Sequence, residues 1–259
     1  MLKKLKSVLE TPKGLLLILA LKATVFSVLL YLVNSQWSIV IVFLTVSFYF
    51  YFRSFFNTRQ FLVSFLTLLA ASLLAVNLSI VNSQWSIVIV IFFSFLFFLL
   101  LGIKDLIFIR REPLYYLLNS LLLLTVFVYF FSFNNFEQPF WFLVKSSAAF
   151  SATFFLFKEF LFMSLRGGAE AISAPLGNQK VNLMASGSAF LSLQFLWVIG
   201  FLPFRSFNAA SLMLLIALIL EDFIVHHLSG TINRRIVLRN ITMFLILAMI
   251  IFGASKWSP

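Results

Sequence analysis

The stretch WSIVIVIFFSFLFFLLLGI, Trp85–Ile103, contains no charged residue, and its only polar side chains besides the tryptophan are two serines. An α-helix rises 1.5 Å per residue, so a helix over this stretch is about 28 Å long and matches a bilayer hydrocarbon core of about 30 Å. A tryptophan begins the stretch and Lys104 follows it, as is common where a membrane helix meets the two interfaces. The stretch therefore predicts a transmembrane helix.

Similar apolar runs recur along the whole chain. Of 259 residues, 62% are hydrophobic and 10% are charged, whereas about 25% of the residues of a soluble domain are charged. All six prolines lie at or outside the ends of the apolar runs, where they do not interrupt a helix. The sequence predicts an all-α, polytopic transmembrane helix bundle that forms a single membrane domain. Its nine predicted spans cover residues 14–33, 37–52, 61–80, 85–103, 114–133, 139–157, 181–202, 207–228 and 238–255.

The basic residues predict how the bundle is oriented. Lys and Arg in short loops stay on the cytoplasmic side, and a cytoplasmic N-terminus leaves only Arg205 and Lys256 in external segments. Indole side chains suit the interface, and each of the five tryptophans then lies near the external end of a span: Trp37, Trp85, Trp141, Trp197 and Trp257. We therefore expect a cytoplasmic N-terminus, an external C-terminus, and a first span that is retained and not cleaved as a signal peptide.

The sequence VNSQWSIVIV occurs at Val33–Val42 and again, letter for letter, at Val81–Val90. In each copy we expect Asn, Ser and Gln to form an external turn and the following residues to begin an inward-going span. The repeat fits either a duplication of helical hairpins, as many transporters show, or a recent copying of a short segment. Identity stops abruptly, because residues 43–45 differ from residues 91–93. The short copying event is therefore favoured.

One segment breaks the apolar composition. Residues 163–180, MSLRGGAEAISAPLGNQK, contain no aromatic residue and three of the nine glycines. The segment predicts a flexible cytoplasmic loop between two spans.

Two charged residues within the predicted spans lie at similar depths. A charge in the middle of a bilayer costs about 2.5–3.5 kcal/mol or more. At 1.5 Å per residue, Lys22 lies about 12 Å into the first span, which starts at the inner face. Glu221 lies about 21 Å along the eighth span, which starts at the outer face, so both residues lie in the inner part of the bilayer. Either the Lys22 ammonium reaches the inner head groups along its flexible stem, or Lys22 forms an intramembrane ion pair with Glu221 or Asp222.

The end of the eighth span holds the candidates for chemistry. Asp222 and His226 are four residues apart and share a helix face. They fit a polar cap at the interface, a proton or substrate role, or part of a metal site. A metal is not expected, because such sites usually need three or four ligands and the chain has two histidines and no cysteine. Nearby, Arg234, Arg235 and Arg239 are weak candidates for binding an anionic substrate or anionic lipid head groups.

No catalytic set assembles from the sequence. We predict a permease-like protein or a membrane scaffold of a prokaryotic plasma membrane, without a cofactor. The alternative is a membrane enzyme that acts on lipid-linked anionic substrates at the cytoplasmic face, with Asp222 or His226 as the acid–base group. The expected partners are the lipid bilayer and, within it, anionic lipid head groups or other membrane subunits. Nucleic acid is not expected as a partner, because the net charge of +11 comes from basic residues scattered through short loops.

Overall fold

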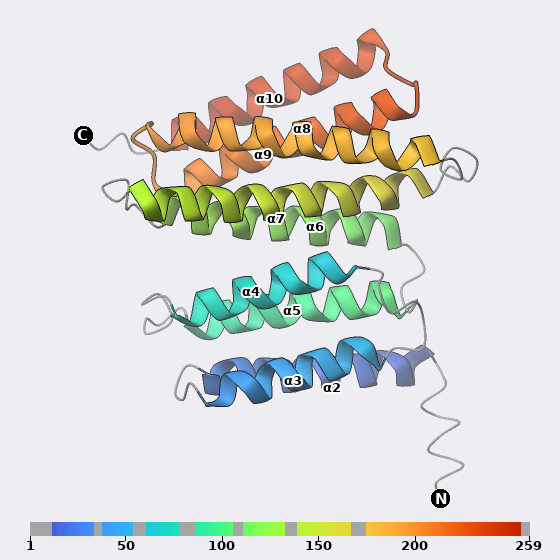
Figure 1. Ribbon diagram of the computed structural model, residues 1–259, viewed down its shortest axis with the longest axis vertical. Helices are drawn as coiled ribbons and strands as arrows, with labels where there is room; N and C mark the ends of the chain where they lie inside the picture. Colours follow the sequence, from blue (N-terminus) through green and yellow to red (C-terminus); the bar gives the residue numbers. More distant parts are fainter. Residues whose placement is uncertain are drawn as a thin grey trace, which may run out of the picture. The chain divides into compact units, whose positions relative to one another are not determined.

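The computed structural model describes residues 12–33, 38–53, 61–77, 86–105, 111–132, 139–166 and 175–254 (Figure 1). Within these ranges the chain forms nine α-helices and no β-strand, which confirms the predicted all-α fold. The helices are α2 (Pro12–Val33), α3 (Ile39–Phe52), α4 (Leu62–Asn77), α5 (Ser86–Lys104), α6 (Arg111–Ser132), α7 (Pro139–Arg166), α8 (Pro175–Gly200), α9 (Ser206–Leu228) and α10 (Arg234–Ala254). The chain divides into two compact units, Met1–Leu118 and Asn119–Pro259, and α6 contributes to both.

Prolines mark where several helices begin. Pro12, Pro139 and Pro175 are the first residues of α2, α7 and α8, and Pro113 lies in the first turn of α6. Proline fits these positions because the first turn of a helix has no intrahelical partner for its N–H groups. Between α9 and α10 the chain turns through Gly230, whose φ of 66° suits glycine. These helix starts and this turn follow from local backbone chemistry.

Seven of the described helices are long and apolar enough to cross a membrane. The two exceptions are α3 and α4, with 14 and 16 residues, or about 21 and 24 Å at 1.5 Å per residue. Both occupy predicted spans and are apolar, but they are shorter than the hydrocarbon core is thick. That these two helices also cross the bilayer stays a prediction.

The helices on either side of the predicted loop at 163–180 are longer than expected. Helix α7 continues to Arg166, and α8 already begins at Pro175. Residues beyond an apolar run can stay helical because helix formation needs suitable backbone partners and not an apolar side chain. The middle of the segment, residues 167–174, lies outside the described residues, as do Trp37, Trp85 and Trp257.

The last four residues of each copy of the decapeptide lie at the beginning of a helix. Ile39–Val42 form the first turn of α3, and Ile87–Val90 lie in the first turns of α5. Their surroundings differ, because Val42 is 50% exposed while its counterpart Val90 is 5% exposed. The copied residues therefore specify how a helix begins, and the rest of each helix decides which face is buried.

A cluster of aromatic rings forms the centre of the first unit. Helix α5 packs against α2 and α4, and α3 packs against α2. The ring of Phe26 stacks on that of Phe97 at 4.3 Å between centroids, and Tyr51 stacks on Phe65 at 4.2 Å. Phe43 contacts Phe26 at 5.0 Å. All five side chains are buried, so dispersion contacts between rings hold these four helices together.

Small side chains allow close packing in the second unit. Helix α8 packs against α7 and α9, and α10 packs against α9. The buried small residues include Ala149 on α7, Ala185 and Ala189 on α8, and Ala209 and Ala210 on α9. Helices in lipid associate through van der Waals contact, which small side chains favour. The buried small residues of α7, α8 and α9 therefore suit helices that pack closely against one another.

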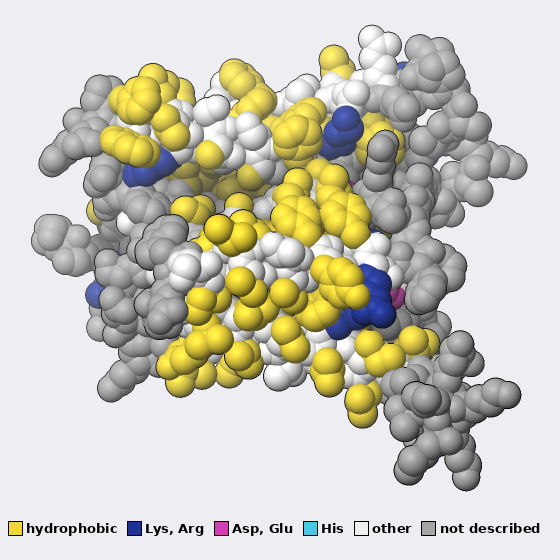
Figure 2. All heavy atoms as spheres, turned by 60° about the horizontal axis from the view of Figure 1, so that its bottom comes forward, with side chains coloured by type: hydrophobic (Ala, Val, Ile, Leu, Met, Phe, Trp, Pro, Cys, Tyr) yellow, Lys and Arg dark blue, Asp and Glu magenta, His cyan; other side chains and the backbone are white. Residues whose placement is uncertain are grey.

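Large apolar side chains cover much of the outward surface of the described helices (Figure 2). The most exposed include Ile41, Phe140, Phe201 and Met249. Water would make such a surface prone to aggregate, whereas lipid tails solvate it well. The apolar surface and the length of the helices therefore both indicate a membrane protein.

Candidate functional site

Two adjacent acidic residues on α9 point to different neighbours. Glu221 and Asp222 are consecutive, so their side chains leave the helix in different directions. Glu221 contacts α6, whereas Asp222 contacts α10. Glu221 is 3% exposed, and Asp222 is only partly buried. The two carboxyl groups therefore belong to two separate polar contacts, and they are described in turn.

Glu221 forms a buried contact with Asn119 on α6. The Asn119 Nδ2 donates a hydrogen bond of 2.7 Å to the Glu221 Oε1. Asn119 is 0% exposed, and its Oδ1 has no hydrogen-bond partner among the described residues. At the other end of the same pair of helices, the Ser206 hydroxyl donates to the Phe131 carbonyl oxygen at 3.1 Å. Helices α6 and α9 thus run side by side in opposite directions.

This contact lies inside the apolar part of both helices. At 1.5 Å per residue, Asn119 lies about 12 Å from the start of α6, and Glu221 lies about 10 Å from the end of α9. Groups buried at this depth have no water to bind, so each polar atom needs a partner from the protein. The carboxyl–carboxamide pair supplies one such bond and leaves the carboxamide oxygen unsatisfied.

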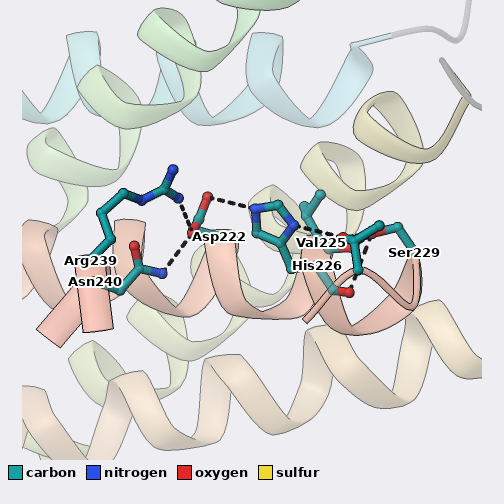
Figure 3. A network of polar contacts seen from close by, with 7 residues as sticks. Asp222, Val225, His226, Ser229, Arg239 and Asn240 are labelled. Atoms are coloured by element: carbon teal, nitrogen blue, oxygen red, sulfur yellow. Dashed lines mark hydrogen bonds and ion pairs between the residues drawn. The ribbon is translucent and has the colours of Figure 1, made fainter. Parts of the chain in front are cut away.

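Asp222 is the centre of a network that joins α9 to α10 (Figure 3). Its Oδ2 accepts hydrogen bonds from Arg239 Nη2 at 3.0 Å and from Asn240 Nδ2 at 2.6 Å. Its Oδ1 lies 3.6 Å from His226 Nε2. The structure therefore brings together three of the residues that the sequence singled out, Asp222, His226 and Arg239.

The network continues from His226 into the link between the two helices. His226 Nδ1 lies 2.8 Å from the Thr231 hydroxyl oxygen, which is 2.9 Å from the Ser229 hydroxyl oxygen. Ser229 in turn donates to the Val225 carbonyl oxygen at 2.8 Å, at the end of α9. This arrangement fixes the imidazole between a carboxylate and a hydroxyl, as a polar cap or an acid–base pair would require.

The three arginines have different surroundings. Arg239 is engaged by Asp222, whereas Arg234 and Arg235 are exposed in the first turn of α10. Arg239 can bind an anion only if its guanidinium group separates from Asp222, or if it contacts Asp222 and the anion at the same time. Among the described residues, no group of three or more His, Asp or Glu side chains is placed to hold a metal ion.

A second set of charges lies in the first unit, at the end of α5. Lys22 Nζ on α2 lies 3.7 Å from Asp105 Oδ2. The neighbouring Lys104 is 2% exposed, donates to the Tyr51 carbonyl oxygen, and has its Nζ 3.4 Å from the centre of the Tyr51 ring. A cation suits this position because the last carbonyl groups of α3 have no intrahelical partner and carry partial negative charge.

Sequence reasoning missed the roles of Lys104 and Asp105, because both were assigned to the end of a span and its loop. One signal was available: Asp105 is the only acidic residue between Glu10 and Glu112. In the described part of its own unit, Lys22 therefore had only Asp105 and Glu112 as possible acidic partners. The predicted ion pair of Lys22 with Glu221 would join one unit to the other, and it stays a prediction, while each residue has a partner in its own unit.

Comparison with known proteins gave no match to any family model, to any curated protein or to any solved structure. The class of protein is therefore defined by the helices themselves. Seven long apolar helices with an apolar outer surface form a multi-pass membrane protein.

Proposed function

We propose that this protein is a permease-like integral membrane protein of a prokaryotic plasma membrane, with a cytoplasmic N-terminus and an external C-terminus. The observation that carries the proposal is the buried contact between Glu221 and Asn119 on two membrane helices. A carboxyl group inside a bundle is costly to keep there, and such groups commonly mark ion or substrate pathways. A scaffold that only associates with partners has no need of this group.

The test compares the small solutes of cells that lack the gene with those of cells that express it. We expect expression to change the cellular level or the uptake of one class of solute, and Glu221→Gln to abolish that change. Phe140→Leu is the matched control, because Phe140 is an exposed apolar side chain. A phenotype that needs the protein but is the same for Glu221→Gln would contradict the permease proposal and favour a scaffold.

The second candidate is a membrane enzyme that acts on lipid-linked anionic substrates. The distance of 3.6 Å between Asp222 Oδ1 and His226 Nε2 favours it, together with the exposed Arg234 and Arg235 at the start of the next helix. It is less favoured because Asp222 already binds Arg239 and Asn240. The two candidates differ in what His226→Ala does. An enzyme loses the conversion of a membrane lipid species, whereas a permease keeps its solute phenotype.

A further inference from the structure

Glu221 differs from Asp222 and Asp105, two carboxylates that each lie close to a cation. Asp222 lies 3.0 Å from an arginine, and Asp105 lies 3.7 Å from a lysine. Glu221 is more deeply buried than either, and no Lys, Arg or His lies within ion-pair distance of it in the described part of the chain. Its one polar contact there is the Asn119 carboxamide. A carboxylate in such a place lacks the cation that would offset its charge.

Asn119 is the residue type that can serve both forms of a carboxyl group. Its NH₂ group donates to the Glu221 carboxyl group in the structure, and its Oδ1 can accept from that group when the carboxyl is protonated. Because the carboxyl group has two oxygens, its protonated form can donate from one oxygen to Oδ1 while the other still accepts from the NH₂ group. The Asn119 Oδ1 is buried and has no partner among the described residues, so an acceptor is present for the proton.

We propose that Glu221 and Asn119 form an intramembrane proton site, in which the carboxyl group takes up and releases one proton and the amide hydrogen-bonds to both forms. The inference rests on the proposed permease function, to which it adds the coupling ion. A buried pair with a hydrogen bond in only the protonated or only the ionised form of the carboxyl group would resist gaining or losing a proton. This pair keeps one in both forms, so proton exchange does not require the helices to separate.

Other charged groups near α9 are engaged elsewhere or lie apart from Glu221. On α9 itself, Asp222 and His226 belong to the α10 network, and His227 is exposed. The remaining described titratable or charged side chains on helices that contact α9 are Glu112, Tyr115, Tyr116 and Tyr129 on α6, Lys145, Lys158 and Glu159 on α7, Lys180 on α8, and Arg234, Arg235 and Arg239 on α10. In the described ranges, Asn119 is the partner the structure gives to Glu221.

The first test measures how Glu221 reacts with dicyclohexylcarbodiimide, an apolar reagent that modifies protonated carboxyl groups. The purified full-length protein in detergent is treated over a series of pH values, and labelled peptides are identified by mass spectrometry. We expect modification of Glu221 that falls about tenfold per pH unit above its midpoint. Glu221→Gln should show none at this position, and Asp222→Asn, the matched control, should leave the labelling of Glu221 in place.

A second measurement needs no reagent to enter the site. Infrared difference spectra between acid and alkaline samples should contain a band of a protonated carboxyl group that is lost in Glu221→Gln and kept in Asp222→Asn. Labelling of Glu221 that does not change with pH, or no labelling together with no infrared band, would overturn the proposal. Both measurements are made without a solute, so a proton site in a protein with no solute phenotype would refute the permease function alone.

Discussion

At the scale of single residues, Glu221 and Lys22 each depend on one particular neighbour. Asn119 gives Glu221 its only described hydrogen bond, and Asp105 gives Lys22 its counter-charge. Removing one member of such a pair leaves the other unsatisfied inside the protein, which costs more than the bond itself is worth. The individual pairs can therefore be tested by substitution.

Asn119→Ala should destabilise the protein by about 1–3 kcal/mol, because the buried carboxyl of Glu221 loses its partner. Gln194→Ala is the matched control, since it removes an amide from an exposed position on α8, where substitutions usually change stability by less than about 0.5 kcal/mol. Unfolding of both variants in mixed micelles of detergent and dodecyl sulfate provides the measurement. Equal stability of the two would show that the buried contact contributes nothing.

Lys22→Met and Asp105→Asn should have a combined effect that differs from the sum of their separate effects by about 0.5–3 kcal/mol, because the two side chains form an ion pair. The check is a double-mutant cycle by the same unfolding measurement. A parallel cycle of Lys22→Met with Glu221→Gln tests the ion pair expected from the sequence. Strict additivity in the first cycle together with coupling in the second would contradict the Lys22–Asp105 ion pair and support a Lys22–Glu221 ion pair.

At the scale of helices, contacts depend on small residues and on polar links at helix ends. Ala185 and Ala189 are fully buried on α8, which packs against α7 and α9. Helix α10 packs mainly against α9, and the Asp222 network ties its first turns to that helix. Substitutions at these two kinds of contact should affect whole helices.

Ala189→Leu should lower the stability of the protein by about 1–3 kcal/mol, because the larger side chain overpacks a contact between helices. The neighbouring Phe190 is exposed, so Phe190→Leu should leave stability nearly unchanged. Thermal unfolding of the two purified variants in the same detergent compares them directly. A stable Ala189→Leu variant would mean that α8 is less closely packed than the structure indicates.

Asp222→Ala should loosen the first half of α10, because Arg239 and Asn240 lose their common acceptor. The partly exposed network is worth about 1–2 kcal/mol, so amide hydrogen exchange in α10 should rise about tenfold. Arg235→Ala removes a charge from the same helix at an exposed position and is the control. Unchanged exchange in Asp222→Ala would show that apolar packing alone holds α10.

At the scale of the whole molecule, the orientation in the membrane can be read from two links. Residues 201–205 join α8 to α9, and residues 229–233 join α9 to α10, so a spanning α9 puts the two links on opposite sides. Phe201 and Ile232 are both exposed within them. Because the chain has no cysteine, no native thiol reacts with a labelling reagent, and a single introduced thiol gives the whole signal.

An impermeant maleimide should label Phe201→Cys in intact cells, and should label Ile232→Cys only after the membrane is opened. This result is expected because Arg234, Arg235 and Arg239 follow the second link and basic residues stay in the cytoplasm. Gel-shift or mass measurement of the labelled protein reads the outcome. The reverse pattern would invert the predicted topology, and labelling of both in intact cells would show that α9 does not span.

The sequence alone determined that the chain is helical and membrane-embedded, because hydropathy and proline position act locally along the chain. It also indicated the Asp222–His226 pair, since residues four apart on a helix meet whatever surrounds them. Only the tertiary structure assigned Asn119 to Glu221 and Asp105 to Lys22, and buried Val90 while exposing Val42. Partners between helices depend on which helices pack together and how each is rotated about its axis, and apolar runs of similar composition fit many such arrangements.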